Sequence, residues 1–195
     1  METPFTLSLS EQDKAGMADI VRAAIERGLV EKEKSGRLES EPSGVLAEPL
    51  GAFVTLKRQG RLRGCIGTVQ GVKPLAHTLN DMAQAAAFSD PRFAPLTAAE
   101  YADADIEISI MGPISPCPGP EEIVIGRHGL ILRKNRRSGL LLPQVPVEWG
   151  WDVPTFLEQL CRKAGLPPGA WKDREAQLYW FEAVCFDLPE KTRLP

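Results

Sequence analysis

Residues 61–68 read Arg61-Leu62-Arg63-Gly64-Cys65-Ile66-Gly67-Thr68, and they place one thiol between two glycines, just after two arginines. The β-prone run at residues 53–56 precedes this stretch, and a short loop that contains Gly60 joins the two. Two such runs joined by a short glycine-containing loop are typical of a β-hairpin. We therefore expect Cys65 to lie late on the second strand of a hairpin.

Side chains of a strand point alternately to two faces, so Arg61, Arg63 and Cys65 are predicted to share one face. A nearby cation favours the thiolate, which is the reactive form of a cysteine whose free pKa is about 8.5. Arg63 is then the predicted neighbour of Cys65, and Cys65 is the candidate catalytic residue. Glycines allow a ligand or another backbone to approach closely, which makes Gly64 and Gly67 candidate ligand-contact positions.

The spacing also fits a second reading of Cys65. Free cysteine is among the most buried residue types and often packs as a small inert hydrophobe. The motif alone leaves both readings open.

Apolar residues recur at helical spacing in three other segments. Ser10 with Asp13 resembles a helix start, and an apolar face follows as far as Ile25. A second helix is expected from Pro74, with polar Asn80, Asp81 and Gln84 opposite its apolar stripe, and a third between Asp152 and Gly165 with Cys161 in its core face. Thr97 with Glu100 is a capping-box pattern for one short helix, and the charged run 31–36 is expected to be a solvated connector.

Strand patterns occupy the rest of the chain. Isoleucines alternate with polar residues over 106–110, and short apolar runs follow at 123–125, 130–132 and 140–142, with a last strand over 178–188. The segment 112–120 holds four prolines, which remove backbone donors, so we expect a stiff loop between two halves. The predicted fold class is α+β, with mixed or antiparallel sheets and flanking helices.

Composition indicates an ordinary folded protein, and its charge balance is compatible with a local basic patch. The chain has 195 residues, is 43% hydrophobic, and carries 23 basic against 26 acidic residues, a net charge of −3. A general nucleic-acid binder usually shows a strongly basic domain, so nucleic acid is not an expected partner. The basic loop at residues 133–137 is expected to be a solvated turn, because the sequence shows no matching basic face elsewhere.

Cysteine and histidine spacing argues against a metal site. The four cysteines form no C-x-x-C pair, and the two histidines, His77 and His128, are far apart in the sequence. We expect no metal and no other cofactor. No signal-like or membrane-spanning stretch is found, so the expectation is a cytoplasmic protein with reduced thiols.

The hexapeptide 62–67 resembles the hallmark of the AMMECR-one family, whose members include the A component of the AmmeMemoRadiSam system. Four further segments are similar to other family motifs, in the same order along the chain: Asp90-Pro91-Arg92-Phe93, Gly126-Arg127-His128-Gly129-Leu130, Leu141-Leu142-Pro143-Gln144-Val145, and residues 156–166 with Trp171. The resemblance spans about residues 10–188.

This resemblance implies a single AMMECR-one-type domain over residues 1–195, with a larger and a smaller subdomain around a cleft that holds the hexapeptide. The proline-rich segment near 112–120 would connect the two subdomains. The resemblance also implies that this protein works with partner proteins of the Memo and radical SAM types. It brings no settled reaction, since a family or fold does not by itself give chemistry.

Two functions remain open at the level of sequence. In the first, Cys65 is a nucleophile or a carrier thiol, Arg63 favours its thiolate, and His128 serves as general base, which requires hydrogen-bond reach between the two. In the second, a noncatalytic module binds an anionic ligand or a peptide through Arg63, Arg92 and Gln144. Cys65 is then structural. The loop of Arg133, Lys134, Arg136 and Arg137 is the narrower RNA-binding version of this second function.

Overall fold

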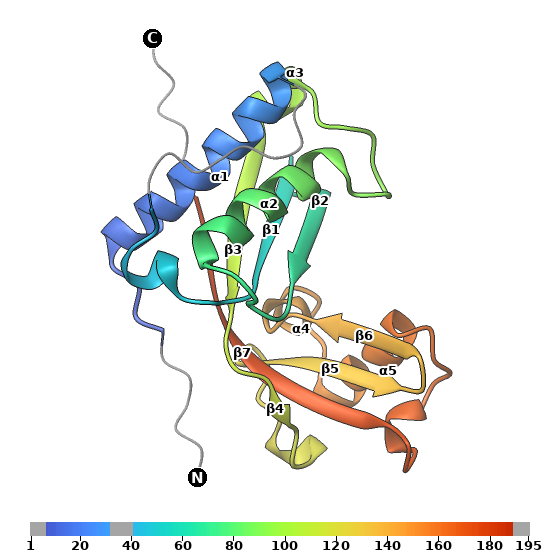
Figure 1. Cartoon of the computed structure of the whole chain (residues 1–195). Helices are drawn as coiled ribbons and strands as arrows, with labels where there is room; N and C mark the ends of the chain where they lie inside the picture. The colour runs from blue at the N-terminus through green and yellow to red at the C-terminus, as the bar shows by residue number, and fades with distance from the viewer. Residues whose placement is uncertain (1–6, 32–40, 189–195) are drawn as a thin grey trace. The chain divides into compact units, whose positions relative to one another are not determined.

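The computed structural model describes residues 7–31 and 41–188 (Figure 1). The described chain divides into two units, which we call the N-terminal unit (residues 7–31, 41–111 and 184–188) and the C-terminal unit (residues 112–183). Most of the predicted charged connector lies in residues 32–40, outside the described residues. Among the described helices, none is long and apolar enough to cross a membrane.

The N-terminal unit combines helices with an antiparallel sheet. Its elements are α1 (Glu11–Glu31), the 3-10 helix η1 (Gly44–Ala47), β1 (Ala52–Arg58), β2 (Arg61–Thr68), α2 (Leu75–Phe88), α3 (Ala98–Ala102), β3 (Ala104–Met111) and the end of β7 (Gln177–Asp187). The strand order is β2, β1, β3, β7, so β2 stands at the edge of the described sheet. The predicted hairpin is confirmed, with Gln59 and Gly60 at positive φ in its two-residue turn.

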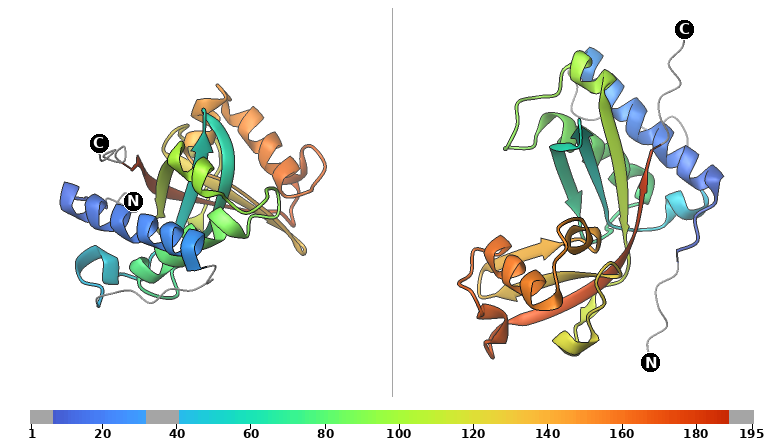
Figure 2. Two further views of the ribbon diagram at one scale, coloured as in Figure 1. Left: turned by 90° about the horizontal axis from the view of Figure 1, so that it is seen from above. Right: turned by 180° about the vertical axis from the view of Figure 1, so that it is seen from behind.

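Helices α1 and α2 pack on one face of this sheet (Figures 1 and 2). Helix α1 begins as predicted, because the Asp13 N–H donates to Ser10 Oγ at 3.1 Å and the Ser10 N–H donates to Asp13 Oδ2 at 2.9 Å. Met17 on α1 is fully buried in a core with Leu56 and Ile108 of the strands. This layer of helices leaves the other face of β1 and β2 to carry Thr55 and Cys65.

The prediction that the polar residues of α2 point away from the core is wrong for two of them. Asn80 and Gln84 are buried, at 3% and 6% exposed. Asn80 Oδ1 accepts a hydrogen bond from Arg27 at 2.7 Å, and Gln84 donates to the Ala24 carbonyl. The reason is that α1 lies along this side of α2, so these side chains bond across the helix pair.

The C-terminal unit contains β4 (Ser115–Pro116), η2 (Pro120–Glu122), β5 (His128–Lys134), β6 (Arg137–Leu141), α4 (Gln144–Glu148), α5 (Val153–Lys163), η3 (Ala170–Lys172) and the start of β7. Its strands follow the order β7, β5, β6, and β4 pairs with β7. Helix α5 begins as predicted, since the Asp152 side chain accepts from the Thr155 N–H at 2.9 Å. Cys161 on α5 is fully buried in the core, which confirms its predicted place.

Two expectations for this unit are corrected. Residues 123–125 form no strand, because the chain leaves η2 and turns: the Val124 carbonyl accepts from the N–H groups of Arg127 and His128. Within the proline-rich loop, Ser115 and Pro116 form the short strand β4, which pairs with β7. Pro116 has no backbone N–H, which a sheet tolerates where that side of the strand faces away from its partner.

Candidate functional site

A bulge at Arg63 shapes the strand that carries Cys65. Cys65 pairs with Thr55 and Gly64 with Leu56, but Lys57 pairs with Leu62, so Arg63 is the inserted residue. Paired side chains of an antiparallel sheet share a face. Leu62, not Arg61, therefore shares the face of Cys65, and the predicted placement of Arg61 is wrong.

The backbone of Cys65 is held from its outer side by an ion pair. The Cys65 N–H donates to Asp90 Oδ2 at 2.9 Å, and Arg92 Nη2 donates to the Cys65 carbonyl at 3.1 Å. The Arg92 side chain donates two hydrogen bonds to the Asp90 carboxylate, at 2.9 and 2.7 Å, and the Arg92 N–H donates a third at 3.1 Å. The pair thus satisfies edge-strand groups that would otherwise face solvent.

The proline between Asp90 and Arg92 positions this ion pair. Pro91 disfavours helical backbone at Asp90, so α2 ends at Phe88, and the Phe93 N–H then closes a turn onto the Asp90 carbonyl at 3.1 Å. The Asp90 side chain is only 2% exposed. Hydrogen bonds from Arg92, with a further one from the Cys65 N–H, hold the pKa of the Asp90 carboxyl well below its ordinary value. Asp90 is therefore a buried anion fixed on the cysteine strand.

The sulfur of Cys65 has its own hydrogen-bond donor. Thr55 Oγ1 lies 3.3 Å from Cys65 Sγ and donates to it, across the non-core face of β1 and β2. Cys65 is partly exposed, while Thr55 is 6% exposed. The sulfur of Cys65 therefore accepts a hydroxyl hydrogen bond on a residue that is not fully buried.

Arg63 lies beside this site but is engaged elsewhere. Its Nε and Nη2 donate to the two carboxylate oxygens of Glu100 at 2.9 and 3.0 Å, and Nη2 also donates to the Ala94 carbonyl. These hydrogen bonds, with those from Thr97, lower the pKa of Glu100 to about 2. The charge of Arg63 is thus matched by Glu100, and the arginine that contacts Cys65 directly is Arg92.

Phe93 links the two arginines. The guanidinium carbons of Arg63 and Arg92 lie 5.7 and 5.5 Å from the centre of its ring, within cation–π range. Both arginines are therefore held in place by a carboxylate and by a shared aromatic face.

The two glycines of the motif have packing roles. A Cβ at Gly64 would lie 2.2 Å from the Ala86 carbonyl oxygen, so the glycine lets α2 approach the strand. A Cβ at Gly67 would lie 2.1 Å from the ring of Phe53, its cross-strand partner. At both positions the group that approaches closely belongs to this chain.

His128 and Gln144 belong to the C-terminal unit. His128 Nδ1 accepts a hydrogen bond from the Val124 N–H at 3.1 Å, and its ring packs on Trp180 with centroids 4.3 Å apart. Burial, and then the charge of Arg127, lower the pKa of His128. Gln144 is the first residue of α4 and is partly buried. Contacts within this unit account for the position of His128.

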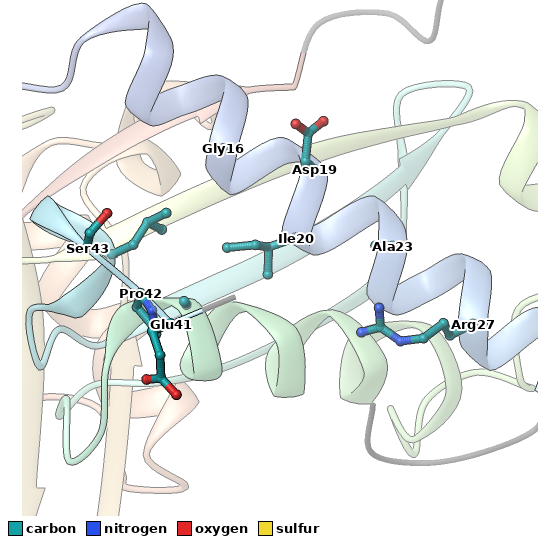
Figure 3. A pocket seen from close by; sticks show the side chains of 10 residues that line it. Gly16, Asp19, Ile20, Ala23, Arg27, Glu41, Pro42 and Ser43 are labelled. Carbon is teal, nitrogen blue, oxygen red and sulfur yellow. The ribbon is translucent and has the colours of Figure 1, made fainter. Parts of the chain in front are cut away.

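A cavity of about 330 Å³ opens elsewhere in the N-terminal unit, beside α1 (Figure 3). Ile20 and Arg27 of α1 line one side, with Pro42 and Leu46 on another. The residues that line it include none of the Cys65 contacts, so we separate it from the cysteine site.

Comparison with known proteins gives this chain a family context. Residues 18–186 match the model of the family described as AMMECR1. The chain is 42% identical over 184 residues to a protein of Methanothermobacter thermautotrophicus, covering 91% of this chain and 95% of that one. It is 44% identical over 181 residues to a Thermococcus onnurineus protein, covering 86% and 88%. The crystal structure of an uncharacterised Pyrococcus horikoshii protein, PH0010, is similar with a TM-score of 0.87 at 38% identity, covering 96% of each chain.

Proposed function

Since this chain belongs to the AMMECR1 family, we propose that it works through Cys65, as a nucleophilic or carrier thiol at the β1–β2 hairpin. One observation supports this most strongly. The Cys65 sulfur accepts a hydrogen bond from the Thr55 hydroxyl, while the Cys65 N–H and carbonyl are hydrogen-bonded to Asp90 and Arg92. The site fixes the position of a partly exposed thiol and offers a donor to its charged form.

Charge at the site favours this role over an anion-binding pocket. Arg63 and Arg92 are each already hydrogen-bonded to a carboxylate, Glu100 and Asp90. An anionic ligand would have to displace these carboxylates before either arginine could offer its full fork. Arg92 still contacts the cysteine, because its Nη2 donates to the Cys65 carbonyl at 3.1 Å and so helps to fix the backbone that carries the thiol.

The proposal extends to the setting in which the thiol works. Memo-type and radical SAM proteins are the partners that the family resemblance suggests, and a cytoplasmic location would keep Cys65 reduced. Co-expression of the chain with such proteins should yield a complex that co-elutes in size-exclusion chromatography. Separate elution of all three proteins would remove this part of the proposal and leave the role of Cys65 to be judged by its own test.

That test uses an activated ester, p-nitrophenyl acetate, as electrophile. The Cys65 thiolate attacks the carbonyl carbon, p-nitrophenolate leaves, and the acetyl group stays on sulfur as a thioester. We expect a burst of about one nitrophenolate per chain at neutral pH and an acetyl adduct on the Cys65 peptide that hydroxylamine removes.

Cys65→Ser should abolish the burst, and Cys185→Ser is the matched control because Cys185 is an exposed cysteine outside the site. A burst that survives Cys65→Ser, or an adduct formed equally at Cys185, would contradict the proposal.

A further inference from the structure

Basic side chains gather at one end of the C-terminal unit. They come from the β5–β6 turn, the end of α5 and the segment around η3: Arg133, Lys134, Arg136, Arg137, Arg162, Lys163, Lys172 and Arg174. We call these eight residues the basic surface. All of them except Lys134 are exposed.

Contacts within the unit join the three segments. Arg137 donates to the Gly165 carbonyl just after α5, and Lys134 pairs with Asp173 just after η3. Gly139 of β6 lies against the backbone of residues 163–164, where a Cβ would come within 2.6 Å of the Ala164 nitrogen. Figure 1 shows the β5–β6 turn beside the coil that follows α5. The basic surface is therefore one feature built from sequence-distant segments.

Charge is strongly segregated in this unit. Residues 112–183 contain nine basic and eight acidic residues, and eight of the basic ones but only one acidic one, Asp173, belong to residues 133–137, 162–163 and 172–174. The overall charge of −3 conceals this local excess. A local positive field of this kind concentrates polyanions at its surface.

Two aromatic rings lie among these cations. The Arg133 guanidinium carbon is 5.2 Å from the centre of the Tyr179 ring, and Lys172 Nζ is 5.0 Å from the centre of the Trp171 ring. Both rings are partly exposed. Cations beside aromatic rings provide phosphate contacts and base stacking together.

The composition of the basic surface favours nucleic acid over a membrane surface or a protein as its partner. The exposed large hydrophobic residues of the described chain are Val30, Leu62, Val72, Val124, Val147 and Trp149, and all lie outside the three segments. Membrane-surface binding and protein interfaces both use an exposed apolar component. Nucleic-acid interfaces are more polar and more positively charged than protein interfaces.

From these observations we infer that the basic surface binds the phosphate backbone of single-stranded nucleic acid. This activity is independent of the Cys65 proposal, because it uses a different unit and different residues.

The test measures binding of a fluorescein-labelled single-stranded RNA of about 20 nucleotides by anisotropy at several salt concentrations. With about four phosphate contacts, affinity should fall roughly 50-fold between about 50 mM and about 200 mM salt. Arg133→Ala with Arg136→Ala, and separately Arg162→Ala with Lys163→Ala, should each weaken binding about tenfold and lower the salt slope by about 1.4.

The matched control replaces Arg58 and Arg61 with Ala, because these two cations lie at the β1–β2 turn of the other unit. The control should bind RNA within about twofold of the unsubstituted protein, and circular dichroism should show that every variant is folded. Absence of binding at the lowest salt would overturn the inference. Weaker binding on substitution of Arg133 and Arg136, with no effect of substituting Arg162 and Lys163, would also overturn it. Tighter binding to phosphatidylserine vesicles or to polyglutamate than to RNA would overturn the assignment to nucleic acid.

Discussion

Cys65 differs from two of the other cysteines in what surrounds its sulfur. Burial raises the pKa of Cys161, and burial likewise raises the pKa of Cys117, so both are held towards the unreactive thiol. Cys65 instead has a hydroxyl donor at 3.3 Å, supplied by Thr55 on the neighbouring strand. The hydroxyl of Thr55 is the single contact on which the proposed reactivity of Cys65 rests.

Thr55→Val keeps the shape of this side chain and removes the donor. Because one neutral hydrogen bond contributes about 1 kcal/mol, we expect alkylation of Cys65 by iodoacetamide to slow about fivefold at neutral pH. Mass spectrometry of the Cys65 peptide gives the rate. Thr68→Val is the control, because Thr68 lies on β2 with Cys65 and its hydroxyl donates to the Gln70 carbonyl instead. Equal rates in the two variants would show that the Thr55 hydroxyl does not act on the sulfur.

At the scale of the element, the β1–β2 hairpin shows how far the sequence leads. The strand-forming runs and the loop with Gly60 predict the hairpin, and the structure confirms it. A two-residue turn without a bulge would pair Thr55 with Gly64, so the contact between Thr55 and Cys65 depends on the insertion at Arg63. The bulge is accompanied by a tertiary contact, the hydrogen bonds of Arg63 with Glu100. Because such a contact lies far along the chain, the local sequence pattern does not predict the bulge.

Other parts of the site were only partly readable from the sequence. The structure shows a turn and an ion pair at Asp90-Pro91-Arg92, a segment that the sequence marks as a family motif. The hydrogen bond from the Cys65 N–H to Asp90 joins residues 25 positions apart, so it depends on how distant segments pack. The burial of Asn80 and Gln84 likewise required knowing where α1 lies. Periodicity finds an element, but its neighbours decide which of its faces are buried.

The same hairpin depends on a close contact with helix α2. Gly64→Ala would place a methyl group 2.2 Å from the Ala86 carbonyl oxygen, and because that atom is backbone, the helix or the strand must shift. We expect a loss of about 1–3 kcal/mol in the free energy of unfolding, measured by urea denaturation.

Gly16→Ala is the matched substitution on α1. Its new Cβ would make an ordinary contact, 3.6 Å from Leu46 Cδ1, so we expect a gain of about 0.5–1 kcal/mol from helix propensity. A Gly64→Ala variant as stable as Gly16→Ala would contradict the described contact between β2 and α2.

At the scale of the whole molecule, the carboxylates around the cysteine strand make stability depend on pH. Pairing with Arg92 holds the pKa of Asp90 below its ordinary value, and pairing with Arg63 lowers the pKa of Glu100 to about 2. A carboxyl whose folded-state pKa is lowered stabilises the fold fully above its unfolded-state pKa and loses that contribution as pH falls. Acid should therefore weaken the fold through these two groups.

For Glu100 the window runs from its ordinary value of 4.5 down to about 2. We expect the difference in unfolding free energy between the unsubstituted protein and Glu100→Gln to be greatest above this window and to shrink as pH falls through it. Urea denaturation at several pH values measures this difference. A difference that stays constant through the window would show that the ion pair with Arg63 does not stabilise the ionised carboxyl.

If Cys65 is the working thiol, folding should activate it instead of protecting it. The most direct measurement is the rate of iodoacetamide labelling of Cys65 at neutral pH in the folded protein, divided by its rate in the urea-unfolded chain. Cys161, which is fully buried, serves as the internal reference that folding must slow. We expect Cys65 to react faster in the folded protein, because only there does Thr55 donate to its sulfur and Arg92 to its carbonyl. Slower labelling in the folded protein, parallel to Cys161, would contradict it.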